Sequence, residues 1–283
     1  MFDVEVFRRE GYVVLRDVVE HRLIDGFVAV LAERVDSLAQ GRFPELGFEH
    51  RLDALYAGRQ LNTREWQKSL FCKEFWEIIT SPSLTDPLRL ILGEEITYQG
   101  NAHLRPYLPR HLDRLPWHQD GQFYGTGVEA MVHSIAQVWL PLVDADADSG
   151  CLALVPRSHH WGLISQEAGP DTDPEEIYRL TAQRVRFEPI QLLPMRKGDL
   201  LLFTNLMAHT GTENRSGRVR WSVDMRFEST YGSRPLTPAL REGYRVVRAR
   251  MASRNARPLR VRGVDGPQHW EEWLADRAEH FTD

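Results

Sequence analysis

DLLLFTNLMAHTGTENRSGRVRWSVDMRFES, residues 199–229, is the stretch that most clearly predicts the fold. It contains two runs rich in apolar residues, separated by a segment with Gly, Asn and Ser. The second run alternates polar with apolar side chains: Arg218, Val219, Arg220, Trp221, Ser222, Val223 and Asp224. Successive side chains of a strand point to opposite faces, so this run predicts a half-buried strand with one polar face.

Other short runs with the same character occur along the chain, and Pro, Gly, Asp or Ser separates most of them: 12–19, 95–108, 134–144, 151–156 and 185–194. Several short strands divided by turn residues are typical of a sandwich or barrel. The predicted fold class is therefore mainly β with flanking helices.

Helical patterns dominate the first third of the chain. Stretches 3–10, 21–38, 65–79 and 84–92 have helical character, and 268–279 resembles a short closing helix. In the second stretch the apolar residues are three and four positions apart: Leu23, Ile24, Phe27, Val28, Leu31 and Val35. We expect the helices to pack on one face of the β core, with 39–62 as a surface loop, in a single domain spanning 1–283.

Composition excludes several classes of protein. The chain has 283 residues, 42% of them hydrophobic, and a formal net charge of −5, which is no signature of nucleic-acid binding. No apolar run approaches the length of about 20 residues needed for a membrane span, and the N-terminus lacks signal-peptide character. We expect a cytoplasmic protein whose two cysteines, Cys72 and Cys151, are reduced.

A candidate metal site begins at LPWHQDGQFYG, residues 115–125. His118 and Asp120 are two apart, so in a strand they would face the same side. His209, at the end of an apolar run, is the best candidate for a third ligand. Two His and one carboxylate leave three octahedral positions open, as in the facial triad of non-haem Fe(II) oxygenases. The same ligands can hold Zn²⁺, so a hydrolase is an alternative, although it gives no reason for an arginine near the site.

That arginine is Arg220, which follows His209 and stands on the polar face of the second run. A guanidinium can bind a carboxylate through two parallel hydrogen bonds, as a dicarboxylic cosubstrate would require. Arg105 occupies one face of the strand before the WHQD segment, while Gln137 and Trp139 share a face of the next strand. We expect these three residues to line the cosubstrate pocket.

The chain resembles the phytanoyl-CoA dioxygenase family of Fe(II)- and 2-oxoglutarate-dependent oxygenases. The resemblance rests on FRREGYVVLRDVV near the start, WHQD at 117–120, SGCLALVPRSHHWG at 149–162, KGDLLLF at 197–203 and HTGTENRSGRVR at 209–220. It implies a double-stranded β-helix, or cupin-like jelly roll, with the metal at its open mouth. It also implies that His118, Asp120 and His209 bind iron, and that Arg220 binds the far carboxylate of 2-oxoglutarate.

Two positions near the implied iron site bear on what the resemblance implies. Members often have a Ser two residues after the second His, where this chain has Gly211. One of the flanking threonines, Thr210 or Thr212, is a candidate replacement for the hydroxyl, or the contact is absent. Related halogenases have a small residue at the position of Asp120. The carboxylate present here therefore favours a hydroxylase.

The resemblance implies hydroxylation of an unactivated C–H bond, with O₂ consumed and succinate and CO₂ released. Desaturation, epoxidation or ring formation would replace hydroxylation if the substrate is held differently. The substrate classes it suggests are secondary metabolites, amino-acid derivatives and acyl compounds. Gln122, Phe123 and Tyr124 are candidates for the substrate wall, and 39–62 and 163–184 for specificity lids. The alternative is a jelly-roll protein that binds a metal or small molecule without turnover. The sequence leaves the oligomeric state open.

Overall fold

The computed structural model describes residues 2–57, 59, 61–110, 115–123, 134–165, 172–230 and 258–278. The α-helices are α1 Val4–Glu10, α2 His21–Ala39, α3 Phe48–Tyr56, α4 Thr63–Trp66, α5 Lys73–Thr80, α6 Pro82–Leu92, α8 Pro174–Val185 and α10 Trp270–Ala278. The short 3₁₀ helices are η1 Gln67–Leu70, η2 Asp120–Phe123 and η4 Ser158–Trp161. The strands are β1 Tyr12–Leu15, β2 Ile96–Tyr107, β3 Ile135–Pro141, β4 Leu152–Leu154, β5 Gln191–Leu193, β6 Leu200–Thr204, β7 His209–Gly211, β8 Arg220–Ser229 and β9 Leu259–Arg262.

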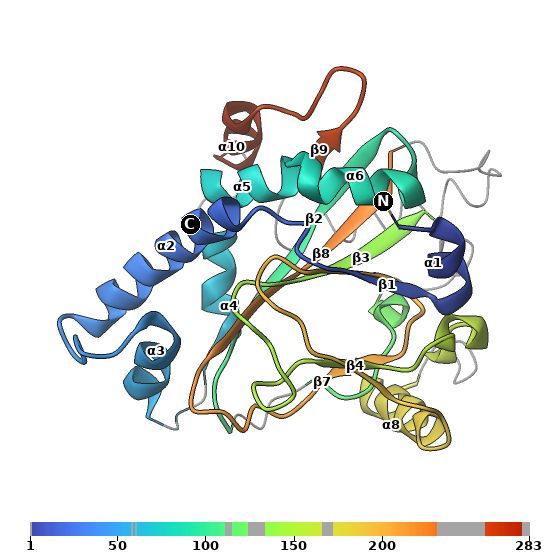
Figure 1. Ribbon diagram of the computed structural model, residues 1–283, viewed down its shortest axis with the longest axis horizontal. Coiled ribbons are helices and arrows are strands. Elements are labelled where there is room, and N and C mark those ends of the chain that lie inside the picture. The colour runs from blue at the N-terminus through green and yellow to red at the C-terminus, as the bar shows by residue number, and fades with distance from the viewer. Residues whose placement is uncertain are drawn as a thin grey trace.

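Two antiparallel sheets form the β core. Within the described residues, six strands make a main sheet in the order β1-β6-β3-β8-β2-β9, and three make a minor sheet in the order β5-β4-β7. Figure 1 shows the long strands β2, β3 and β8 crossing the molecule, with β4 and β7 below them. The predicted class, mainly β with flanking helices, is confirmed.

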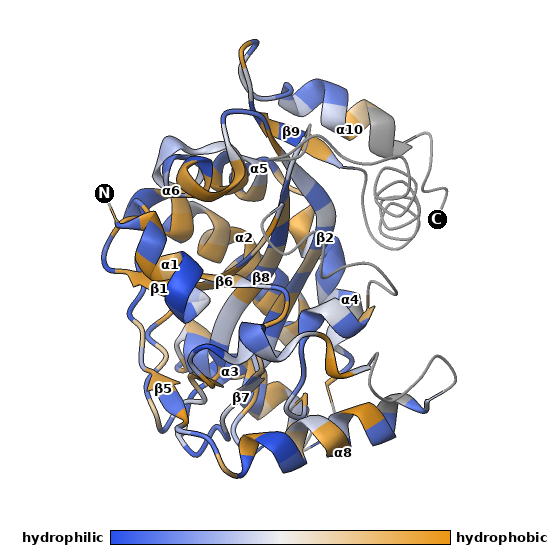
Figure 2. Cartoon of the chain, turned by 90° about the vertical axis from the view of Figure 1, so that its right-hand side faces the viewer, coloured by the Kyte–Doolittle hydropathy of each residue, from blue (hydrophilic) through white to orange (hydrophobic). Residues whose placement is uncertain are grey.

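The helices cover the outer face of the main sheet. Figure 1 shows α2, α5 and α6 along one side of β2, β3 and β8. The buried apolar residues of these helices and of the outer strand faces belong to one cluster, which includes Phe27, Leu31, Phe75, Leu88, Val138, Leu202 and Trp221. Figure 2 shows that α6 carries both hydrophobic and hydrophilic residues, as an amphipathic helix does. Burial of these apolar faces is what fixes the helices to the sheet.

The inner face of the main sheet packs on the minor sheet. Trp139, Leu201 and Phe203 of the main sheet join Leu152 and Leu154 of the minor sheet in a second buried cluster. Alternation along each strand divides the residues between the two clusters, because neighbours point to opposite faces. Leu200 and Leu202 lie in the outer cluster, for example, and Leu201 and Phe203 in the inner one.

Several helix predictions are confirmed. The helix over 3–10 is present as α1 and ends at Gly11, whose φ of 83° and N–H bond to Phe7 O at 2.8 Å form its cap. The helix over 21–38 is present as α2 and buries Leu23, Phe27 and Leu31, as its spacing predicted. The closing helix is present as α10. Cys72 and Cys151 are free thiols, also as expected.

Other element predictions were wrong. The supposed loop 39–62 contains α3, because Leu52 and Leu55 are three apart and both buried. The helical region expected over 65–79 is present, but it is divided into α4, η1 and α5. Most of the run 185–194 lies outside any strand, and only Gln191–Leu193 pairs with β4. Single-domain organisation over 1–283 stays a prediction.

No helix in the described parts of the chain combines the length and the apolar character required to cross a bilayer.

Candidate metal centre and cosubstrate pocket

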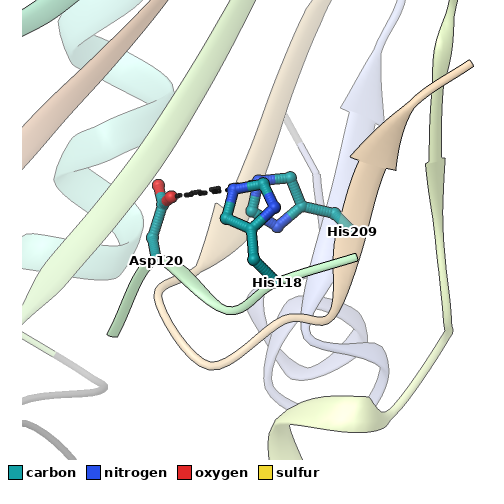
Figure 3. Close-up of side chains that lie close together, drawn as sticks. All are labelled: His118, Asp120 and His209. Carbon is teal, nitrogen blue, oxygen red and sulfur yellow. Dashed lines mark ion pairs between the residues drawn. The ribbon is translucent and has the colours of Figure 1, made fainter. Parts of the chain in front are cut away.

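Three predicted ligands lie together between the two sheets. His209 begins β7 of the minor sheet, and His118 forms an isolated antiparallel bridge with it. Asp120 begins η2, two residues further on. One ligand atom from each of the three residues falls within 4.8 Å of the other two, and all three residues are buried. Figure 3 shows the carboxylate and both imidazoles facing one another.

The route by which His118 and Asp120 converge differs from the sequence prediction. They were expected to share one face of a strand, but Asp120 lies in a 3₁₀ helix and only His118 pairs with a strand. The turn into η2 brings the carboxylate round towards the imidazoles. Gln119 points away between them, where its amide bonds Gly162 O, Leu206 O and Ile164 N.

Hydrogen bonds orient both imidazoles for metal binding. His118 Nδ1 lies 2.8 Å from Pro116 O, and His209 Nδ1 lies 2.9 Å from Met207 O. Because a carbonyl oxygen only accepts, each Nδ1 carries the proton and each Nε2 keeps a lone pair. These Nε2 atoms are 3.5 and 4.0 Å from Asp120 Oδ1. The three atoms therefore offer two neutral nitrogens and one anionic oxygen, a donor set suited to a divalent transition metal.

Electrostatics keep the ligands in the forms that bind metal. Burial acts to raise the pKa of Asp120, but Arg226 and the two imidazoles outweigh it and hold that pKa well below its usual range. Burial and the neighbouring His118 lower the pKa of His209 from 6.5 to about 4. At neutral pH the site therefore presents a carboxylate and a neutral His209.

A pocket opens beside these ligands. Its walls come from both sheets and from the segment before η2: Arg105, Tyr107, Leu115, His118, Asp120, Trp139, Leu152, Phe203, His209, Gly211, Arg220, Asp224 and Arg226. Apolar and aromatic side chains form one part of this wall, and three arginines and two aspartates form another, so the pocket can bind a ligand that carries charge.

Arg220 is a buried cation in the wall of this pocket. Its guanidinium carbon lies 4.8 Å from the ring centre of Tyr107 and 5.6 Å from that of Trp139. Nη1 donates to Ser222, while Nε has no hydrogen-bond partner among the described residues. Burial lowers the pKa of Arg220 to about 10, so the group stays charged at neutral pH. A buried cation with unused donors is a suitable place for an anionic ligand.

The structure brings some of the other predicted pocket residues to this site and leaves others outside. Arg105 and Trp139 line the pocket. Gln137 is fully buried beside it, and neither of its amide atoms has a partner in the described part of the chain. The hydroxyl of Thr210 is turned away and donates to Leu115 O at 2.7 Å. The cosubstrate roles of these residues stay predictions.

The candidates for the substrate wall lie partly outside the described residues. Phe123 is 40% exposed, and its ring centre is 6.1 Å from that of His118. Tyr124 lies outside the described residues. The candidate lid segment 163–184 includes most of α8, and burial raises the pKa of Tyr178 on this helix, with the charges of Glu175 and Asp120 adding to the effect.

Two charged residues of the pocket were missed as site residues by the sequence prediction. Arg226 donates to Asp120 Oδ2 at 2.8 Å, and Asp224 bonds both Arg226 and Arg105. The signal was present in the sequence, since the polar alternation Arg220, Ser222, Asp224 continues to Arg226. The contact between Arg226 and the candidate ligand Asp120 could not be read from the sequence, because it depends on the turn at η2.

Comparison with known proteins links this geometry to one family. The sequence model described as phytanoyl-CoA dioxygenase matches residues 7–222. Among solved structures, the apo form of ThoJ, a non-heme monooxygenase, aligns with a TM-score of 0.58 at 17% identity, over 98% of this chain and 96% of that one.

Two further structures have a similar fold and contain ligands. The epimerase SnoN from nogalamycin biosynthesis, in complex with Fe³⁺, alpha ketoglutarate and nogalamycin RO, has a TM-score of 0.50 at 18% identity, over 82% of this chain and 84% of SnoN. EctD from S. alaskensis, with 2-oxoglutarate and 5-hydroxyectoine, has a TM-score of 0.54 at 17% identity, over 82% of this chain and 77% of EctD. At these identities the likeness shows the fold alone, and it confirms the predicted jelly roll.

Proposed function

Because the chain belongs to the phytanoyl-CoA dioxygenase family of Fe(II)- and 2-oxoglutarate-dependent oxygenases, we propose that it hydroxylates an unactivated C–H bond of a small molecule. Succinate and CO₂ are the other products of this reaction. The observation that carries the proposal is the pairing of His118, Asp120 and His209 with a buried cation, Arg220, in one pocket.

The three ligands fit Fe(II) in number and kind. Two imidazole nitrogens and one carboxylate oxygen would occupy one face of an octahedral ion and leave three positions for other ligands. When bound, iron and 2-oxoglutarate supply the activation of O₂ and the oxidation of the C–H bond. The protein holds the imidazoles in the binding tautomer through Pro116 O and Met207 O.

Arg220 is the residue that would bind the far carboxylate of 2-oxoglutarate. Its guanidinium packs against the rings of Tyr107 and Trp139, and these contacts hold it in place. A carboxylate that reaches Arg220 would supply the acceptors that its donors lack. In a buried site such a charge-assisted hydrogen bond is strong. Arg220 lines the same pocket as the three ligands, so it would hold the far carboxylate of a dicarboxylate whose keto acid end meets the iron.

The substrate is a small molecule of one of three classes: a secondary metabolite, an amino-acid derivative or an acyl compound. Asp120 fills the position where related halogenases have a small residue, which favours transfer of oxygen over transfer of halide. ThoJ is a monooxygenase and SnoN an epimerase on a similar fold, so the outcome depends on how the substrate is placed.

The test is 2-oxoglutarate-dependent release of succinate by purified protein with Fe(II), O₂ and ascorbate, with panels from the three substrate classes. We expect succinate above background, and a product that gains one oxygen atom from ¹⁸O₂ with a true substrate. Asp120→Ala should abolish both signals. If saturating Fe(II) and 2-oxoglutarate give no succinate with any panel, the enzyme assignment fails and a non-catalytic binding protein becomes the better hypothesis.

A further inference from the structure

A chain of charged contacts runs from the metal ligand Asp120 into the main sheet. Arg226 Nη2 donates to Asp120 Oδ2 at 2.8 Å, and Arg226 Nη1 donates to Asp224 Oδ2 at 2.6 Å. Asp224 Oδ1 accepts from Arg105 Nε at 2.9 Å. The side chains of Asp120 and Arg226 are only 4% and 8% exposed, so solvent screens their contact little.

The two oxygens of Asp120 have different surroundings. Oδ1 faces the Nε2 atoms of His118 and His209, at 3.5 and 4.0 Å. Oδ2 is taken by the guanidinium of Arg226. A carboxylate whose second oxygen is held in this way offers the metal one oxygen, whereas a free carboxylate can turn and chelate through both.

We propose that Arg226 is a positioning residue for the metal centre, which holds Asp120 as a one-oxygen ligand. The inference rests on the proposed function, because its consequence is specific to that chemistry. One oxygen from Asp120 leaves three octahedral positions open, two for the keto acid and one for O₂. Chelation by both oxygens would occupy one of these positions.

Asp224 anchors the positioning residue from the other side. Asp224 and Arg226 are two apart on β8 and share its inner face, so the backbone sets the origin of both side chains. The guanidinium is planar and presents separate nitrogens, which lets one group bond both carboxylates at once. With Asp224 on Nη1, Nη2 is directed at Asp120.

The simpler alternative is that Arg226 only neutralises two buried carboxylates. Lysine separates the two ideas, because it keeps the positive charge but carries it on a single nitrogen with no fixed fork. If charge alone matters, Arg226→Lys retains the metal site. If geometry matters, the same variant loses it although net charge is unchanged.

The experiment is a Co(II) titration of apo-protein, followed through the visible d–d absorption, which reports both affinity and coordination geometry. Arg226→Lys should weaken Co(II) binding by about 10- to 100-fold and alter the absorption spectrum, as loss of outer-shell partners does at metal sites. Arg218→Lys is the matched control. Arg218 also bridges two carboxylates, Glu49 and Asp146, but does so away from the metal ligands.

The outcomes separate this inference from the proposed function. Wild-type affinity and spectrum in Arg226→Lys would overturn the positioning role while leaving the metal site intact. Failure of the wild-type protein to bind Co(II) or Fe(II) would overturn both. If Arg226→Lys does not fold, Asp224→Asn carries the test: it should weaken Co(II) binding in the same direction, and unchanged binding there would also refute the proposal.

Discussion

Successive residues of strand β8 alternate between two faces, one in apolar surroundings and the other in polar, charged surroundings. The outer face carries Trp221, Val223, Met225 and Phe227, all fully buried against the helices and neighbouring strands. The inner face carries Arg220, Ser222, Asp224 and Arg226, three of which line the pocket beside the metal ligands. One strand therefore contributes to both the core and the site.

The difference shows how stability and chemistry are separated in this fold. The outer residues gain free energy from apolar burial, which requires only that shape and volume match. The inner residues bury charge, which costs free energy unless a ligand or partner compensates it. Substitutions on the outer face should therefore change unfolding, and those on the inner face should change binding.

The largest effect is expected for Trp221→Ala on the outer face. Trp221 stacks on Phe48 with ring centres 4.8 Å apart and meets Trp66 edge-on at 5.1 Å. The cavity left behind should lower the free energy of unfolding by about 3–5 kcal/mol, measured by urea denaturation. The folded fraction should bind Fe(II) and 2-oxoglutarate as the wild type does. Loss of binding in protein that is still folded would contradict the separation.

Arg220→Met on the inner face should weaken ligand binding without destabilising the fold. Removal of the guanidinium should weaken 2-oxoglutarate binding at fixed Fe(II) by about 2 kcal/mol, or about 30-fold. The apo-protein should become more stable by about 1 kcal/mol, because a buried cation with an unused donor is replaced by an apolar side chain. Anaerobic titration and urea denaturation test the two halves. A destabilised apo-protein with intact 2-oxoglutarate binding would reverse the expected pattern.

Met225→Leu should have the smallest effect. Met225 is fully buried in the outer cluster, and leucine has nearly the same volume. The free energy of unfolding should change by about 1 kcal/mol or less, with no change in 2-oxoglutarate affinity. A change in affinity larger than the change in stability would show that the outer face takes part in ligand binding.

Much of this arrangement is predictable from the sequence because alternation is a local property. Polar and apolar residues alternate at 218–224, and that pattern by itself puts Arg220 on the polar face of its strand. Strand order is not local, and nothing in the sequence showed that β2 pairs with both β8 and β9. The helix α3 has helical spacing at Phe48, Leu52 and Leu55, but it is only nine residues long and has no side-chain N-cap, so its local signal is weak. Phe48 also stacks on Trp221, a contact between segments far apart in the sequence.

The sequence pointed to the three candidate ligands but not to the residue that supports Asp120. His118, Asp120 and His209 stand out as residue types, whereas Arg226 becomes visible only when η2 turns Asp120 towards β8. Thr210 was chosen for its position beside His209, but its hydroxyl bonds Leu115 O instead of facing the pocket. Position in the sequence does not determine where a side chain points at the end of a short strand.

The most direct test of the central claim is an anaerobic absorbance titration of apo-protein with Fe(II) and 2-oxoglutarate. The wild type should develop the visible metal-to-ligand charge-transfer band of a chelated 2-oxo acid. His209→Ala should lose the band, and Arg220→Ala should require much more 2-oxoglutarate to form it. Absence of the band in the wild type at saturating iron and cosubstrate, or an undiminished band in His209→Ala, would contradict the account.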